Sequence, residues 1–170
     1  MRRGMVFAPL AVAALLVTAC TGSQSAGAAR SSAAVAGAGV AGGSGCAGQP
    51  PVSPLPVWAR SGFSPADQAM PHVLGEAGNI VAILWAPRDA LHSPPLQDRH
   101  NKILWVSRVP VVTADPLVIR ATLAGSTRTA TVSVPGGPGP SYVDLPAPGC
   151  WTLHLSWSGH TDELQLRYVA

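Results

Sequence analysis

The sequence predicts an all-β protein in which an antiparallel β-sandwich of about seven strands follows a disordered tether. Two observations carry this prediction. Short apolar or alternating runs are separated by turns that draw on the 18 glycines and 17 prolines of the 170-residue chain. No convincing amphipathic helix is present, although residues 64–70 allow a single helical turn.

Two runs are typical of buried central strands. Residues 79–86 (Asn-Ile-Val-Ala-Ile-Leu-Trp-Ala) are apolar and β-branched and lie between a glycine and a proline. Residues 102–107 (Lys-Ile-Leu-Trp-Val-Ser) have the same character. Residues 117–124 and 128–134 flank a short Gly-Ser-Thr turn, which predicts a hairpin.

The clearest alternation lies at the end of the chain. Within residues 151–157, Trp and Leu occupy one face while Thr, His and Ser occupy the other. After the turn 159–161, residues 164–168 place Leu, Leu and Tyr on one face, so the pair predicts a hairpin with one solvated face. A Gly/Pro loop at 135–140 and a short edge strand at 142–145 complete a sandwich of immunoglobulin-like type.

The five tryptophans divide into two groups. Those in predicted strands are expected in the core: Trp85, Trp105, Trp151 and Trp157. Trp58 lies in a proline-rich segment, where an exposed aromatic ring would suit glycan or protein binding.

The first 20 residues have the pattern of an export signal. Arg2 and Arg3 precede an almost purely apolar run, Met5 to Val17, and Val-Thr-Ala-Cys follows at 17–20. The pattern resembles the lipobox of bacterial lipoproteins, in which the cysteine thiol takes a diacylglycerol and the chain is cut before that cysteine. The resemblance implies a signal peptide over 1–19, fatty-acid (palmitate-type) lipidation of Cys20, and anchoring at the outer face of the cytoplasmic membrane.

Alternatives to this interpretation stay open from the residues alone. An uncleaved membrane helix is disfavoured because Met5 to Ala19 is 15 residues, short of the roughly 20 that span a bilayer core. A plain secretory signal cut elsewhere is the second alternative. The pair Arg2–Arg3 also leaves the general secretory and twin-arginine export routes both open.

Composition divides the remainder into a tether and one domain. Residues 21–48 are almost entirely Ala, Gly and Ser, which cannot bury enough apolar surface to offset chain entropy. We therefore expect a lipid-anchored disordered tether over 20–50 and the β-sandwich domain over 51–170. Although the whole chain has a net charge of +3, it has no basic cluster, so no nucleic-acid partner is expected.

The three cysteines suggest one disulfide bond. If Cys20 carries lipid, Cys46 and Cys150 remain as an even pair in an exported protein, which favours a bond between them. Two unrelated thiols are the alternative.

A second resemblance concerns the domain. Residues 101–106 (Asn-Lys-Ile-Leu-Trp-Val) and 148–153 (Pro-Gly-Cys-Trp-Thr-Leu) resemble strings in small uncharacterised β-sandwich lipoproteins of actinobacteria. The resemblance covers roughly Trp58 to Tyr168. It implies the fold and the location, and no activity.

One predicted loop, 86–101, carries candidate metal ligands. It contains Asp89, His92, Asp98 and His100, which are residue types that bind zinc, and long loops on rigid sandwiches often carry function. The loop contains no HExxH motif, no histidine pair at i,i+4 and no CxxC motif, so nothing in its sequence fixes a ligand geometry. We therefore expect a solvated polar loop, and neither a metal nor another cofactor.

Catalysis is not expected, because no GxSxG elbow supports a serine nucleophile beside His154 or His160. The main hypothesis is a non-catalytic binding or accessory domain whose partner is an envelope protein, a cell-wall polymer or a small extracellular ligand. The alternative is a small envelope metal-binding protein or hydrolase that uses the Asp89/His92/Asp98/His100 loop. A third hypothesis is a structural sensor lipoprotein in which tether length matters most.

Overall fold

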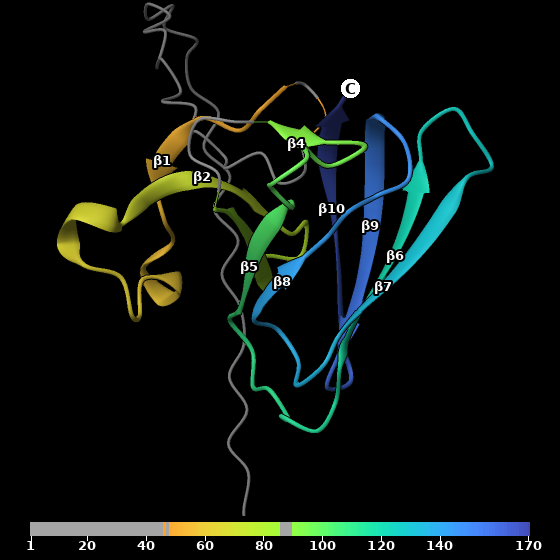
Figure 1. The fold of residues 1–170 in the computed structure, drawn as a ribbon. Helices are drawn as coiled ribbons and strands as arrows, with labels where there is room; N and C mark the ends of the chain where they lie inside the picture. Colours follow the sequence, from red (N-terminus) through yellow and green to blue (C-terminus); the bar gives the residue numbers. More distant parts are fainter. Residues whose placement is uncertain (1–45, 47, 86–89) are drawn as a thin grey trace, which may run out of the picture. The chain divides into compact units, whose positions relative to one another are not determined.

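The computed structural model describes residues 46, 48–85 and 90–170, which form an all-β sandwich (Figure 1). One sheet has the strand order β1-β2-β3-β5-β8 and the other has the order β4-β10-β9-β6-β7. Every pairing is antiparallel except that of β4 with β10. The strands are β1 (Val52–Pro54), β2 (Ala69–Leu74), β3 (Ile80–Leu84), β4 (Leu91–His92), β5 (Lys102–Ser107), β6 (Leu117–Leu123), β7 (Thr129–Val134), β8 (Pro140–Tyr142), β9 (Gly149–Trp157) and β10 (His160–Val169).

The prediction of a sandwich is confirmed, but the described residues contain ten strands and not about seven. The additional strands are β1, β2 and β4, which are short or interrupted by proline and are held by pairing with a neighbour. The predicted edge strand is present, but it begins and ends earlier than 142–145: the ladder is Pro140–Tyr142. Val143 and Leu145, which follow this ladder, place their side chains in the core.

The main core lies between the two sheets. In β9 the predicted alternation holds, since Trp151, Leu153 and Trp157 are buried while His154 is exposed. The buried indole N–H groups also find acceptors, as buried polar groups require. Trp151 Nε1 donates to the Ala147 carbonyl at 2.9 Å, and Trp157 Nε1 donates to Ser107 Oγ at 3.0 Å.

Strand β3 is buried on both faces, which explains its uninterrupted apolar sequence. Ile80, Ala82 and Leu84 face the main core. Val81 and Ile83 face a second cluster on the outer side of the same sheet. Residues 55–63, which include the 3-10 turn η1 (Val57–Ala59), cover that cluster with Leu55 and Ala59; a second turn, η2 (Pro65–Asp67), follows.

A two-residue turn sets the register of the last hairpin. Ser158 and Gly159 both have positive φ, 46° and 77°, as a type I′ turn requires. His160 is consequently opposite Trp157, and the ladder continues to Tyr168 opposite Gly149. Every inward residue of β9 therefore meets an inward residue of β10.

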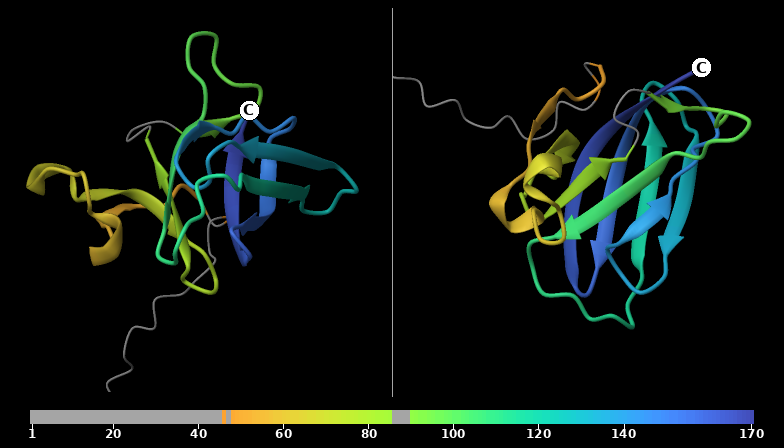
Figure 2. Two further views of the ribbon diagram at one scale, coloured as in Figure 1. Left: turned by 90° about the horizontal axis from the view of Figure 1, so that it is seen from below. Right: turned by 60° about the vertical axis from the view of Figure 1, so that its left-hand side comes forward.

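A disulfide joins Cys46 to Cys150, with their Cα atoms 5.4 Å apart, as the cysteine count favoured. It attaches the start of the domain to the beginning of β9, beside the end of β10, where Arg167 Nη1 donates to the Cys46 carbonyl at 3.5 Å. In the right-hand view of Figure 2, the first described residues and the C-terminus lie at the same end of the sandwich. We call this end the tether end.

The predicted signal peptide, Cys20 and most of the predicted tether lie outside the described residues. Among the residues that are described, no helix combines the length and hydropathy needed to cross a membrane.

Asp162 links the two sheets at the opposite end. Asp162 is 8% exposed, and its carboxylate accepts hydrogen bonds from the backbone amides of Ala77, Asn79 and Glu163 at 2.8–2.9 Å. The β2–β3 turn is thereby fastened to β10. Gly75 completes the fit, because a Cβ at that position would collide with this carboxylate.

We expect Asp162→Ala to lower the free energy of unfolding by about 2–3 kcal/mol, since it leaves backbone amides without their charged acceptor. Denaturant unfolding measures this loss. Asp162→Asn keeps one oxygen acceptor and should cost less. A loss below about 0.5 kcal/mol for the alanine variant would contradict the role of this carboxylate.

Candidate functional site

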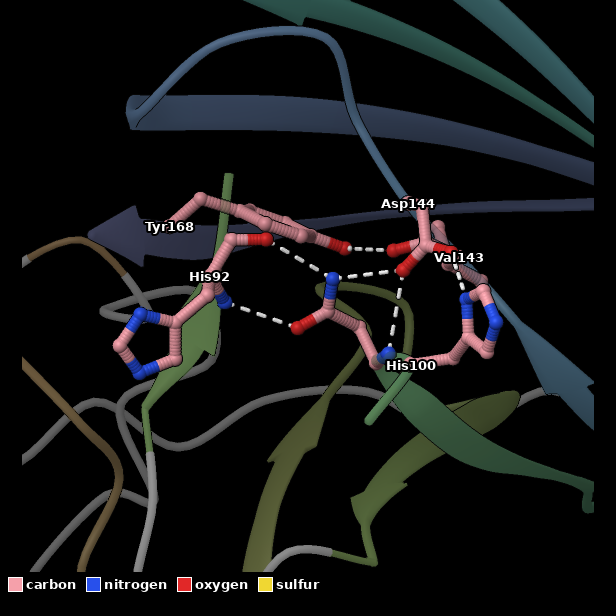
Figure 3. A network of polar contacts seen from close by, with 6 residues as sticks. His92, His100, Val143, Asp144 and Tyr168 are labelled. Atoms are coloured by element: carbon pink, nitrogen blue, oxygen red, sulfur yellow. Dashed lines mark hydrogen bonds and ion pairs between the residues drawn. The ribbon is translucent and has the colours of Figure 1, made fainter. Parts of the chain in front are cut away.

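The structure places His100 in a polar network at the tether end (Figure 3). His100 Nδ1 lies 2.7 Å from Asp144 Oδ2, and Asp144 Oδ1 accepts from the Asn101 side chain at 2.7 Å and from its backbone amide at 3.1 Å. The buried Asn101 side chain also exchanges hydrogen bonds with the backbone of His92. Asn101 therefore ties β4 and the start of β5 to the segment that follows β8.

These contacts set the titration of Asp144. Burial alone would raise the pKa of Asp144, but the hydrogen bonds from Asn101 and His100 outweigh it and hold this pKa below its usual value. Nearby, burial raises the pKa of Tyr168, with a smaller contribution from the Asp144 charge. The Tyr168 hydroxyl donates to the Val143 carbonyl at 2.7 Å and thereby fastens β10 to the same segment.

The lowered pKa predicts how stability depends on pH. Between the folded and unfolded pKa values of Asp144 the unfolded chain binds more protons, so stability is present above about pH 4 and is lost as the pH falls below it. Asp144→Asn should thus be less stable than the wild type near neutral pH, with a difference that shrinks in acid. Urea melts across this range measure it. Asp98→Asn, on an exposed side chain, is the matched control, and equal pH profiles for the wild type and Asp144→Asn would contradict the prediction.

The candidate metal ligands do not converge within the described residues. His92 and His100 lie on opposite sides of the network in Figure 3, and Asp98 is exposed on the loop between them. Asp89 lies outside the described residues. Across residues 46, 48–85 and 90–170, no group of three His, Cys, Asp or Glu side chains is placed to hold a metal ion.

An exposed row of aromatic and cationic side chains begins at His100. The His100 ring lies 5.1 Å from the ring of Tyr142, and Tyr142 is directly opposite Lys102 in the β5–β8 ladder. Lys102 Nζ lies 5.1 Å from the centre of the Trp85 ring, which also contacts Phe63. We call His100, Tyr142, Lys102 and Trp85 the aromatic strip.

The strip corrects one expectation. Trp85 was predicted in the core, but it is 44% exposed, and Tyr142 is 61% exposed. Trp85 follows β3 directly, and its place in the alternation puts it on the outer face of the sheet, where Phe63 at the end of residues 55–63 covers it only in part. Trp105, Trp151 and Trp157 are buried as expected, while Trp58 is half-buried against the second cluster.

The second candidate surface is the outer face of the other sheet. A cross-strand row is formed there because Arg120 of β6 is opposite His154 of β9, which is opposite Glu163 of β10. Beside this row lies a shallow groove of about 420 Å³, bounded by Glu76 and Ala77 of the β2–β3 turn, Ser156 and Thr161. The groove is at the end of the β9–β10 hairpin remote from the disulfide.

The groove holds charges of both signs. His154 Nδ1 lies 2.7 Å from Glu163 Oε2, with both side chains accessible to solvent. Arg120 is exposed and forms no hydrogen bond or ion pair with another described residue through its guanidinium. The arrangement therefore offers a free planar donor group next to an imidazole–carboxylate pair. Hydroxyl side chains and the carboxylates of Glu76 and Asp162 also line the groove, so the guanidinium of Arg120 is the group that would bind an oxyanion there.

Sequence reasoning identified His154 as a residue of the solvated face, but not Arg120 or Glu163 as its neighbours. Their alternation with buried residues shows that they point outward. Their adjacency depends on the order β10-β9-β6, which no local pattern contains. The same holds for Asp144, which meets His100 across 44 residues of chain.

Comparison of the chain with protein-family models, with curated proteins and with solved structures finds no match.

Proposed function

We propose that the chain is a non-catalytic binding or accessory domain that a lipid on Cys20 holds at the outer face of the bacterial cytoplasmic membrane. Its ligand binds in the groove beside Arg120, His154 and Glu163, and presents an oxyanion to Arg120. The ligand belongs to an envelope protein or to a cell-wall polymer. The row of opposite charges beside an open groove is the observation that carries this proposal.

Three features support binding over catalysis. The groove is open to solvent and presents both polar and apolar surface on a rigid sheet, which suits recognition of an extended partner. The pair His100–Asp144 has the donor and acceptor of a catalytic dyad, but no hydroxyl or thiol within the described residues hydrogen-bonds to His100 as a nucleophile would. The hydrogen bonds that Asp144 accepts from Asn101 have a structural role, because they hold the segment after β8 against the start of β5.

The anchor is tested by cell fractionation. Cys20→Ser should remove the protein from the membrane fraction, because the thiol that takes the lipid is gone. The double variant Cys46→Ser/Cys150→Ser is the matched control and should stay with the membrane. Equal membrane retention of Cys20→Ser and wild type would exclude lipid anchoring at this residue.

The groove is tested by capture of the partner after reversible cross-linking in intact cells. Arg120→Ala should reduce recovery by about tenfold, since the loss of one charged hydrogen-bonding group costs roughly 1.5 kcal/mol. Arg108→Ala, on an exposed arginine outside the groove, should leave recovery unchanged. Treatment with a wall-degrading enzyme before capture distinguishes a polymer from a protein partner. Recovery by Arg120→Ala equal to that by wild type would overturn the groove as the binding site.

A further inference from the structure

We infer that the aromatic strip (His100, Tyr142, Lys102 and Trp85) rests in the headgroup layer of the membrane to which the domain is tethered. This inference rests on the lipidation of Cys20 in the proposed function, but it concerns a surface on the other sheet and at the other end of the sandwich from the groove. The partner that it assigns is a lipid–water interface.

The position of the strip carries the first part of the argument. His100 and Asn101 are hydrogen-bonded to Asp144, and the Asn101 side chain is hydrogen-bonded to the backbone of His92 in β4. Strand β4 in turn pairs with the last residues of β10. Those residues lie beside Arg167, which is opposite Cys150. The strip is consequently at the tether end, where the disulfide attaches Cys46 and the chain that leads back to Cys20.

The aromatic side chains of the strip are exposed to solvent, which is the second part of the argument. Residues 55–63 pack against the apolar outer face of this sheet and reach Trp85 through Phe63, but Trp85 and Tyr142 remain 44% and 61% exposed. Leu96, in the loop that leads to His100, is also exposed. Exposed large apolar side chains that gather on one face mark interaction surfaces in soluble domains, and Lys102 links Trp85 and Tyr142 into one such face.

The chemistry of the side chains selects the partner. Trp and Tyr are enriched at membrane interfaces because their rings have an apolar body and a polar group. Lys102, held over the Trp85 ring, adds a cation that anionic headgroups attract. A polysaccharide would gain stacking from the same rings, but it would not explain why the strip lies at the tether end.

Because the domain is tethered, a weak contact between the strip and the membrane is sufficient to hold the strip at the bilayer surface. A domain that is already anchored meets the bilayer at a high effective concentration, so the strip need not bind free vesicles tightly. With the strip against the lipid, the groove on the opposite end is directed away from the membrane.

Tryptophan fluorescence in vesicles tests this placement. The full-length protein, purified from cells that make it with Cys20 intact, is reconstituted into phosphatidylcholine/phosphatidylglycerol vesicles with and without brominated acyl chains, which quench nearby indoles. We expect bromine-dependent quenching in the wild type, its loss in Trp85→Phe, and its retention in the matched control Trp58→Phe, whose ring is half-buried.

A second pair of variants keeps the reporter and changes its surroundings. Tyr142→Ser should reduce the quenching of Trp85, whereas Val112→Ser should not, because exposed Val112 lies beside Ser158 at the far end. Protein that stays on the vesicles with the same quenching in wild type and Trp85→Phe would overturn the inference alone. Protein that does not stay on the vesicles would overturn lipid anchoring, and the inference with it.

Discussion

Replacing both Cys46 and Cys150 with serine should lower the free energy of unfolding by about 4–5 kcal/mol. The two residues are separated by 104 positions, so the bond closes almost the whole domain into one loop and restricts the unfolded chain strongly. Cys46 has little else to hold it: its described contact outside the disulfide is the carbonyl that accepts from Arg167. Most of the loss therefore comes from the unfolded state.

Denaturant melts of the oxidised wild type, the reduced wild type and the double serine variant measure this effect. The two forms without the bond should unfold at the same lower denaturant concentration, and a reductant should not change the double variant. Stability of the reduced wild type within about 1 kcal/mol of the oxidised protein would contradict a stabilising role for the bond.

Trp151→Ala should destabilise the domain by about 3–5 kcal/mol, because it empties the largest side-chain volume at the start of β9. Trp151 is fully buried, and its Nε1–H donates to the Ala147 carbonyl. The substitution thus removes core contacts and leaves this carbonyl without its donor. Leu153→Ala, also fully buried, should cost about 2–5 kcal/mol.

Thr152→Ala is the matched control, since Thr152 lies between these two residues on the outer face of the same strand. It should change stability by less than about 0.5 kcal/mol. A loss below about 1 kcal/mol for Trp151→Ala in urea melts would contradict its place in the core.

The strands that the sequence predicts are those in which the order of apolar and polar residues reflects which faces are buried. In β9 and β10 the period-2 alternation identifies both the strands and their inner faces, and β3 is apolar throughout because the protein covers both of its sides. β1 and β4 are three and two residues long. They exist through pairing with β2 and β10, and no local pattern predicts such pairing.

In the candidate sites, too, local alternation predicts some features and strand pairing alone determines the others. The outward direction of His154 follows from alternation, whereas its neighbours Arg120 and Glu163 follow from strand order. Trp85 was misassigned because an apolar run does not reveal where the covering segment ends. Cys20 lies in a part of the chain that the structure does not describe, so its lipidation still rests on the sequence alone.

The proposals assign separate roles to the two ends of one sandwich. The tether end carries the disulfide, the His100–Asp144 fastening and the aromatic strip. The far end carries the β2–β3 turn fixed by Asp162 and the groove beside Arg120. Anchoring and ligand binding would then use surfaces that do not compete.

Photo-cross-linking from the groove in intact cells tests the central claim most directly. A photoreactive residue replaces Thr161 at the groove or, as a control, Thr127 in the exposed β6–β7 turn. The account predicts one dominant adduct from position 161, absent from position 127, reduced about tenfold when Arg120→Ala is added and lost when Cys20→Ser is added. Equal adducts from both positions, or an adduct at 161 that neither substitution changes, would contradict a tethered domain that binds through this groove.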